Sequence, residues 1–112
     1  MMSINKKNRI LLVEDDSADA FALHEDLAAD AMHDYAITHV TCAADALVHI
    51  QENTYDVVLL DMGLPDSQEF EALDSLRTYN KTIPIIVLTG NHNESMGMAA
   101  LREGAQDYFD QT

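Results

Sequence analysis

The sequence predicts an α/β fold built on a parallel sheet, and two observations carry this prediction. Short apolar runs alternate along the chain with longer segments of helical periodicity, which is typical of βα units around a parallel sheet. Three of the runs, at residues 10–13, 57–60 and 85–88, are apolar at every position. Strands covered on both faces have this pattern, whereas a half-exposed strand alternates. We therefore expect these three segments at the centre of the sheet.

The other elements follow from the same alternation. Strands are expected at residues 9–14, 35–40, 56–61, 83–89 and 107–109. Helices are expected between them at residues 17–29, 43–51, 66–78 and 93–103. The resulting order is βαβαβαβαβ, with nothing after the fifth strand.

Each expected helix carries a stripe of apolar residues at helical spacing, and we expect these stripes to pack on the core. In the first helix the stripe is formed by Ala20, Phe21, Leu23, Leu27 and Ala28. The later stripes are Ala43, Ala46, Leu47 and Ile50, then Phe70, Leu73 and Leu76, then Met96, Ala99, Ala100 and Leu101.

Polar residues and a glycine indicate where three of the helices begin or end. Asp16 or Ser17 is expected to cap the first helix. Asp66 and Glu69 form a pattern like a capping box at the start of the third helix. Gly104 is expected just beyond the end of the fourth helix, where a glycine adopts the left-handed conformation most readily.

Length and composition limit the function. A chain of 112 residues forms one domain, 1–112, with its own core. Twenty acidic against six basic residues give a formal net charge of −14, which repels nucleic-acid phosphates and anionic lipid but attracts cations and basic protein surfaces. We expect a cytoplasmic domain that binds neither nucleic acid nor membrane, because the sequence has no membrane span and no signal-peptide core. The single cysteine, Cys42, excludes an internal disulfide and is expected near the core.

Acidic residues collect where the first and third strands end. Glu14, Asp15 and Asp16 follow the first strand, and Asp61 ends the third. In an open parallel sheet, ligands bind at the carboxyl ends of the strands, so Glu14, Asp15 and Asp61 converge if these strands are neighbours. Clustered carboxylates oppose one another's ionisation unless a cation is present. Mg²⁺ suits a site of a few carboxylates, so the sequence predicts a magnesium site here.

Further candidates belong to the same edge of the sheet. Thr89 ends the fourth strand and is followed by Gly90, which leaves access to its hydroxyl. Gly63 and Pro65 lie in the loop after Asp61, where proline fixes the backbone. A threonine or an aromatic residue in a strand is unremarkable by itself. None of the five histidines forms a metal-ligand pair with the acidic cluster in the sequence.

The segments ILLVEDDSADA, DVVLLDMGLPDS, IPIIVLTG and REGAQDYF, in this order and spacing, resemble the receiver domain of bacterial two-component response regulators. The resemblance covers nearly the whole chain and implies a flavodoxin-like, three-layer sandwich with a five-stranded parallel sheet of order 2-1-3-4-5. It implies that a histidine kinase or a phosphotransfer protein phosphorylates Asp61. It further implies that Thr89 bonds the phosphoryl group and that Tyr108 is an aromatic switch.

The same resemblance implies the ligands of the metal ion. Asp15 and Asp61 are expected to bind Mg²⁺ directly, Glu14 to bind through water, and the Gly63 carbonyl to be a further ligand. The phosphorylated domain is then expected to act on an output domain, either covalently attached or separate. Whether the domain forms a homodimer is left open.

The sequence departs from the family in two places. The lysine that normally follows the fifth strand is Gln111, and the usual proline after it is Thr112. A neutral donor forms a weaker hydrogen bond to a phosphoryl group than a charged one, so the phosphorylated state is expected to be less well stabilised. The chain also stops before the family's fifth helix. We therefore expect the N-terminal part of a longer protein, with one sheet face partly uncovered; a partner or a symmetry mate filling the gap is the alternative.

Three classes of function follow. The first is a phosphorylation-dependent switch, which signals and is not an enzyme. The second is a phosphorylation-independent interaction module on the same fold, which Gln111 favours and the acidic set disfavours. The third is a phosphohydrolase of the haloacid dehalogenase type, which needs a second aspartate two positions after the nucleophile. Gly63 stands there instead, and the chain is short for that fold, so this third class is the least expected of the three.

Overall fold

The computed structural model describes residues 7–30, 32, 34–68, 70–90 and 93–111. The strands are β1 (Asn8–Val13), β2 (Tyr35–Val40), β3 (Val57–Asp61), β4 (Ile85–Thr89) and β5 (Asp107–Asp110). The helices are α1 (Ser17–Ala28), α2 (Ala43–Glu52), α3 (Glu71–Tyr79) and α4 (Glu94–Arg102). The strands pair in parallel in the order β2-β1-β3-β4-β5, which confirms the expected fold and strand order.

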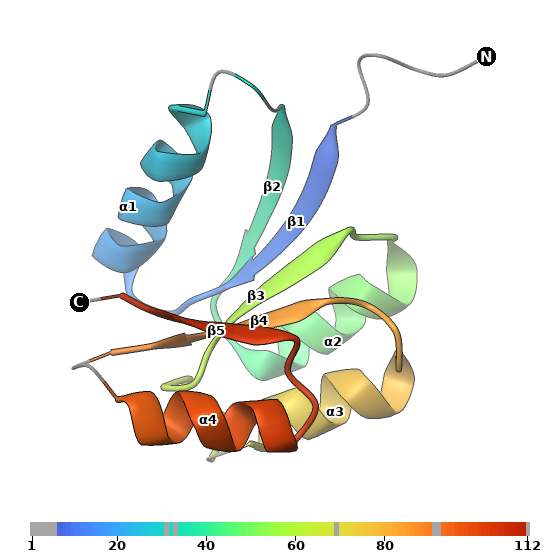
Figure 1. The fold of residues 1–112 in the computed structure, drawn as a ribbon. Coiled ribbons are helices and arrows are strands. Elements are labelled where there is room, and N and C mark those ends of the chain that lie inside the picture. Colours follow the sequence, from blue (N-terminus) through green and yellow to red (C-terminus); the bar gives the residue numbers. More distant parts are fainter. Residues whose placement is uncertain (1–6, 31, 33, 69, 91–92, 112) are drawn as a thin grey trace.

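Helices lie on both faces of the sheet. In Figure 1, α1 lies on one face, and α2, α3 and α4 lie on the other. The strands that contain the three unbroken apolar runs, β1, β3 and β4, are the three inner strands, as these runs predicted. Their side chains alternate between the two faces, so that Leu11 and Val58 join the main core while Leu12 and Leu88 join a smaller cluster under α1. Both core clusters therefore fix the same three strands.

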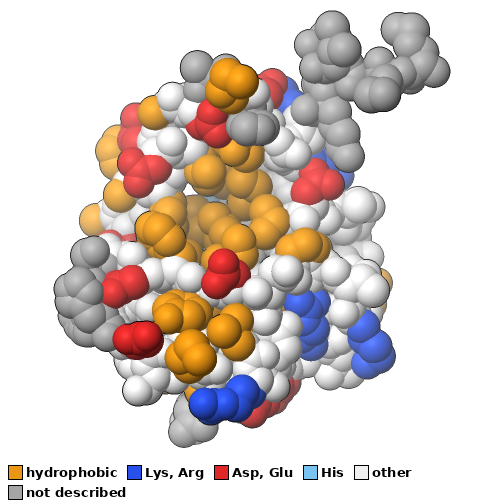
Figure 2. Space-filling view, viewed as in Figure 1, with side chains coloured by type: hydrophobic (Ala, Val, Ile, Leu, Met, Phe, Trp, Pro, Cys, Tyr) orange, Lys and Arg blue, Asp and Glu red, His pale blue; other side chains and the backbone are white. Residues whose placement is uncertain are grey.

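The face under α1 is only partly covered. A groove of about 300 Å³ runs between α1 and the sheet, and Figure 2 shows apolar side chains gathered around a hollow beside α1. Its apolar lining consists of Leu23, Leu27, Leu59, Ile86, Leu88 and Phe109. Phe109 is 53% exposed on the edge strand β5. The predicted uncovered sheet face is thus present.

The first helix differs from its predicted packing. Ala20 is buried, but Phe21 is 67% exposed and Ala28 is also exposed. Phe21 follows Ala20 directly, and adjacent helical residues point about 100° apart, so both cannot face the sheet. The prediction that Phe21 packs in the core is therefore wrong. The predicted cap is confirmed, because the Asp16 carboxylate accepts hydrogen bonds from the backbone N–H groups at the start of α1.

The start of α3 also differs from its prediction. The helix begins at Glu71, not at residue 66. Within the preceding turn, the Ser67 hydroxyl accepts a hydrogen bond from the backbone N–H of Ala72 at 3.0 Å. Glu69, the other member of the predicted capping box, lies outside the described residues. The chain therefore makes a longer turn between β3 and α3 than the residue pattern indicated.

Asp66 caps a different helix from the one predicted. Its two carboxylate oxygens accept hydrogen bonds from the backbone N–H groups of Ala43 (2.8 Å) and Ala44 (3.0 Å) at the start of α2. These bonds favour the ionised form, so the pKa of Asp66 lies below its ordinary value. Cys42, the residue at the N-cap position of α2, is half-buried as expected and makes no side-chain capping bond. Asp66 thus joins the loop after β3 to α2.

The remaining element boundaries agree closely with those predicted from the sequence. Each strand begins and ends within two residues of its predicted bounds. Gly104 follows α4 with a φ of +115°, which confirms the predicted helix end. Of the helices in the described part of the chain, none has both the length and the apolar character that crossing a membrane requires.

Candidate functional site

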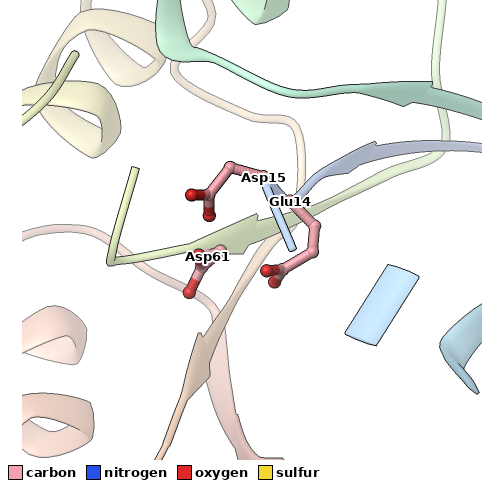
Figure 3. Close-up of side chains that lie close together, drawn as sticks. All are labelled: Glu14, Asp15 and Asp61. Atoms are coloured by element: carbon pink, nitrogen blue, oxygen red, sulfur yellow. The ribbon is translucent and has the colours of Figure 1, made fainter. Parts of the chain in front are cut away.

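The predicted acidic cluster forms at the carboxyl ends of β1 and β3. Figure 3 shows the carboxylates of Glu14, Asp15 and Asp61 turned toward one another. One carboxylate oxygen from each residue lies within 4.8 Å of the others. The register of the sheet causes this meeting, because Val13 on β1 pairs with Leu60 on β3 and the acids follow directly. The two strands thus bring together residues that are far apart in the sequence.

The three carboxylates differ in their exposure to solvent. Glu14 is buried, with 1% of its surface exposed, Asp61 is half-buried and Asp15 is exposed. Burial raises the pKa of Glu14 from 4.5 to about 8, and the negative charge of Asp61 adds to the effect. The Oε1 atom of Glu14 accepts a hydrogen bond from the Asp16 N–H at 3.2 Å, and this bond lowers the pKa of Glu14. Glu14 therefore resists ionisation while the cluster lacks a compensating cation.

Asp61 has a similar environment. Burial is the main cause that raises its pKa, and proximity to Asp15 adds to it, whereas a hydrogen bond from the Gly63 backbone lowers it. Gly63 lies beside the carboxylate: a Cβ atom there would be 3.6 Å from Asp61 Oδ2. The structure thus places the Gly63 backbone beside Asp61; that the Gly63 carbonyl binds the metal ion stays a prediction.

Thr89 ends β4 at the same edge of the sheet. The register places Asp61 opposite Leu88, so Thr89 is the next residue along the neighbouring strand. Only 3% of its surface is exposed, and within the described part of the chain its hydroxyl has no hydrogen-bond partner. Burying a polar group without a partner costs about 1–3 kcal/mol.

The buried polar atoms fit a charged ligand at this edge. Glu14 Oε2, like the Thr89 hydroxyl, has no hydrogen-bond partner among the described residues. The cluster offers oxygen donors from three carboxylates, which suits a hard divalent cation such as Mg²⁺. A cation relieves the repulsion between the carboxylates, and a hydroxyl beside them suits an anionic group bound to that cation. The residues present therefore fit the metal ion that the sequence predicted.

Two other predicted residues belong to β5 and to the position directly after it. The Tyr108 ring packs on α4 at Gly97, and Tyr108 is half-buried against the main core. The backbone N–H of Gln111 donates a hydrogen bond to the Thr89 carbonyl at 2.7 Å, which holds Gln111 beside the end of β4. The Gln111 residue lines a pocket along α1 together with Asp19.

One contact was not predicted from the sequence. The Nε2 atom of His39, on β2, lies 2.7 Å from the backbone carbonyl oxygen of Glu14. The sequence contained only an indirect signal, the polar residue His39 directly before Val40, the last residue of β2. That signal does not identify a partner, because the two residues are separated by 25 positions.

The chain is similar to known proteins over most of its length. The model of the response regulator receiver domain family matches residues 10–111. The transcriptional regulatory protein KdpE of Staphylococcus aureus is 36% identical over 103 residues, which are 92% of this chain and 43% of KdpE. This chain thus spans less than half the length of that relative.

Solved structures of response regulators have the same fold. A putative response regulator from Chloroflexus aurantiacus has a TM-score of 0.84 at 28% identity, with 94% of this chain and 85% of that chain covered. The Mn²⁺-bound form of response regulator Rcp1 has a TM-score of 0.80 at 27% identity, with 94% and 81% covered. With the family match over residues 10–111, these similarities show that the chain belongs to the family of response regulator receiver domains of two-component systems.

Proposed function

We propose that this domain is a phosphorylation-dependent switch, in which Asp61 accepts a phosphoryl group from a histidine kinase or a phosphotransfer protein in a Mg²⁺-dependent reaction. The observation that carries the proposal is the position of Asp61. It is a half-buried carboxylate that lies beside two other acids at one edge of the sheet, where Thr89 has a buried hydroxyl without a partner among the described residues. Such a hydroxyl is suited to donate to an oxygen of a phosphorylated Asp61.

Glu14, Asp15 and Asp61 are the residues that would hold Mg²⁺, with the Gly63 carbonyl as a further ligand. When bound, the ion supplies charge that screens the approach of two anions and stabilises negative charge on the transferring group. The Mn²⁺-bound form of the similar regulator Rcp1 supports this assignment. The raised pKa values of Glu14 and Asp61 give a second reason, because a cation beside the two acids favours their ionised forms.

Asp61 provides the nucleophile. One of its carboxylate oxygens attacks the phosphorus atom of the donor, and the bond from phosphorus to the donor's nitrogen or oxygen breaks. The new aspartyl phosphate carries more negative charge and more acceptor oxygens than the carboxylate did. Asp61 needs no general base, because it reacts in its ionised form.

Thr89 and Tyr108 transmit the change. The Thr89 hydroxyl, which has no partner within the described residues, donates to a phosphoryl oxygen and draws the end of β4 toward Asp61. α4 begins at Glu94, shortly after β4 ends at Thr89 in the sequence, and the Tyr108 ring packs on α4. The altered surface of α4 and β5 then acts on an output domain, attached or separate, so the domain works as a switch and not as an enzyme with a separate substrate.

The test is the intact mass of the protein after incubation with Mg²⁺ and a small acyl phosphate. We expect a gain of one phosphoryl group in the wild type, no gain in Asp61→Asn, and no gain when EDTA replaces Mg²⁺. The Asp61→Asn variant has nearly the same size, so it controls for phosphorylation elsewhere. A wild type that folds and binds Mg²⁺ but never gains the group would overturn the proposal.

The second candidate is an interaction module that works without phosphorylation. Gln111 favours it, because the residue that replaces the family's lysine carries no charge. Under this alternative, Asp61→Asn retains full partner binding and signalling. Under the first proposal, the same variant loses the response to the kinase.

A further inference from the structure

Glu14 is held at both of its backbone polar groups by two consecutive residues of β2. Its N–H donates to the Val40 carbonyl at 3.0 Å. Its carbonyl oxygen lies 2.7 Å from His39 Nε2. Because a carbonyl oxygen only accepts, Nε2 must carry the proton of this hydrogen bond. Glu14 is therefore clamped to the neighbouring strand before the chain turns into α1.

The two halves of this clamp depend differently on the sequence. The bond to Val40 is main chain to main chain, and any residue other than proline at position 14 forms it. The bond to His39 needs a side chain with an N–H at the correct reach. The paired register ends at Val13 and Val40, so the His39 imidazole supplies a donor to Glu14 just beyond the end of the strand ladder.

The hydrogen bond persists in either protonation state of the imidazole. The neutral tautomer with the proton on Nε2 and the imidazolium ion both present an N–H at this atom. His39 is exposed and lines an open surface pocket together with Leu12, Ser17, Ala20, Phe21, His24 and Glu25.

The clamp fixes the peptide group that joins Glu14 to Asp15. This peptide sets the directions in which both side chains leave the main chain, and both belong to the acidic cluster. Glu14 is buried and its Oε1 accepts from the Asp16 N–H at 3.2 Å, so a rotation of the peptide would disturb this bond as well. A site whose ligands are fixed before binding loses less freedom when the ligand binds.

We propose that His39 is a positioning residue of the acidic site, whose Nε2–H group holds the Glu14–Asp15 peptide in the orientation that binds a divalent cation. The effect on cation affinity rests on the proposed function, whereas the clamp itself exists without the ion. Residues that orient metal ligands typically change affinity by about 10–100-fold when they are removed. For this single backbone contact we expect a loss of roughly tenfold.

The experiment compares three variants with the wild type by calorimetric titration with Mg²⁺. His39→Leu removes the donor, and His39→Gln keeps an N–H at nearly the position of Nε2. His24→Leu is the matched control, because His24 lines the same pocket and makes no hydrogen bond to Glu14 among the described residues. We expect the Kd for Mg²⁺ to be about tenfold higher in His39→Leu and close to the wild-type value in His39→Gln and His24→Leu. Equal loss in the Leu and Gln variants, or no loss in either, would overturn the proposal.

A second measurement uses the metal-free protein. Amide hydrogen exchange of Asp16, whose N–H bonds Glu14 Oε1, should be faster in His39→Leu and restored in His39→Gln. Nitrogen NMR of the wild-type imidazole should show a protonated Nε2. If the wild type binds no Mg²⁺ but these two results hold, the proposed function fails and the clamp stands. Unchanged exchange in His39→Leu would contradict the clamp itself.

Discussion

The ring of Tyr108 packs directly on the main chain of α4 at Gly97. A Cβ atom built at Gly97 would lie 2.5 Å from Cγ and 2.7 Å from Cε2 of the Tyr108 ring, closer than real Cβ atoms approach other atoms. Gly97 is buried within α4, where glycine costs about 1 kcal/mol relative to alanine. The missing side chain makes the room that the ring occupies. The position of Tyr108 is therefore set by the residue at position 97.

Gly97→Ala should destabilise the domain and displace the Tyr108 ring. Overpacking costs about 1–3 kcal/mol, from which the gain in helix propensity subtracts about 1 kcal/mol. In a Tyr108→Ala background, the same substitution should be neutral or stabilising, because only the helix gain remains. Urea unfolding of the four proteins of this double-mutant cycle measures the coupling. The same destabilisation in both backgrounds would show that the ring does not depend on Gly97.

Thr89→Val should have opposite effects on stability and on phosphorylation. The Thr89 hydroxyl is buried and makes no hydrogen bond with the described residues, so replacing it by a methyl group should stabilise the unphosphorylated domain by about 1 kcal/mol or more. The same change should shorten the lifetime of the aspartyl phosphate, because a donor to the phosphoryl group is lost. Thermal unfolding and the decay of the phosphorylated mass measure the two effects. Thr89→Ser keeps the hydroxyl, so its aspartyl phosphate should decay more slowly than that of Thr89→Val; matching lifetimes would contradict the role of the hydroxyl.

Without Mg²⁺, stability should fall as pH rises from about 4.5 to about 8. Folding raises the pKa of Glu14 from 4.5 to about 8. Between these two pH values the folded protein therefore binds more protons than the unfolded chain. Stability decreases with pH wherever the folded state binds more protons. Asp61, whose pKa is also raised, contributes in the same direction. Urea unfolding in EDTA at several pH values measures the slope.

Two controls distinguish the contribution of Glu14 to the pH dependence of stability from that of the other acidic residues. Glu14→Gln cannot ionise, so its stability should depend much less on pH. Adding Mg²⁺ to the wild type should also flatten the slope, since the cation favours the ionised carboxylates. A slope that is unchanged in Glu14→Gln would assign the pH dependence to other residues.

Gln111→Lys should accelerate phosphorylation of Asp61. A hydrogen bond to a charged group contributes about 1 kcal/mol more than a neutral one, which corresponds to about fivefold in rate. Gln106→Lys is the matched control. It makes the same change of charge on an exposed residue just before β5, far from the carboxyl end of that strand. Equal rates in the two variants would show that charge near Thr89 does not limit the transfer.

The sequence by itself determined the layers of the fold and the make-up of the site. Unbroken apolar runs identified β1, β3 and β4 as the inner strands, because burial on both faces leaves a strand no polar positions. The strand order was implied by the resemblance to receiver domains and is confirmed. Acids at the ends of β1 and β3 then had to meet, since neighbouring parallel strands end at one edge.

Only the tertiary structure decided which partner each polar side chain has. Asp66 caps α2 across 23 residues and not the helix that follows it, and His39 reaches Glu14 across 25. Phe21 is exposed because Ala20 faces the sheet. Hydrophobic periodicity is the spacing at which apolar residues recur along one helix or strand, so it describes a single element and not its partners. A hydrogen bond between distant elements depends on where the sheet and the turns place two atoms, and no local pattern records that distance.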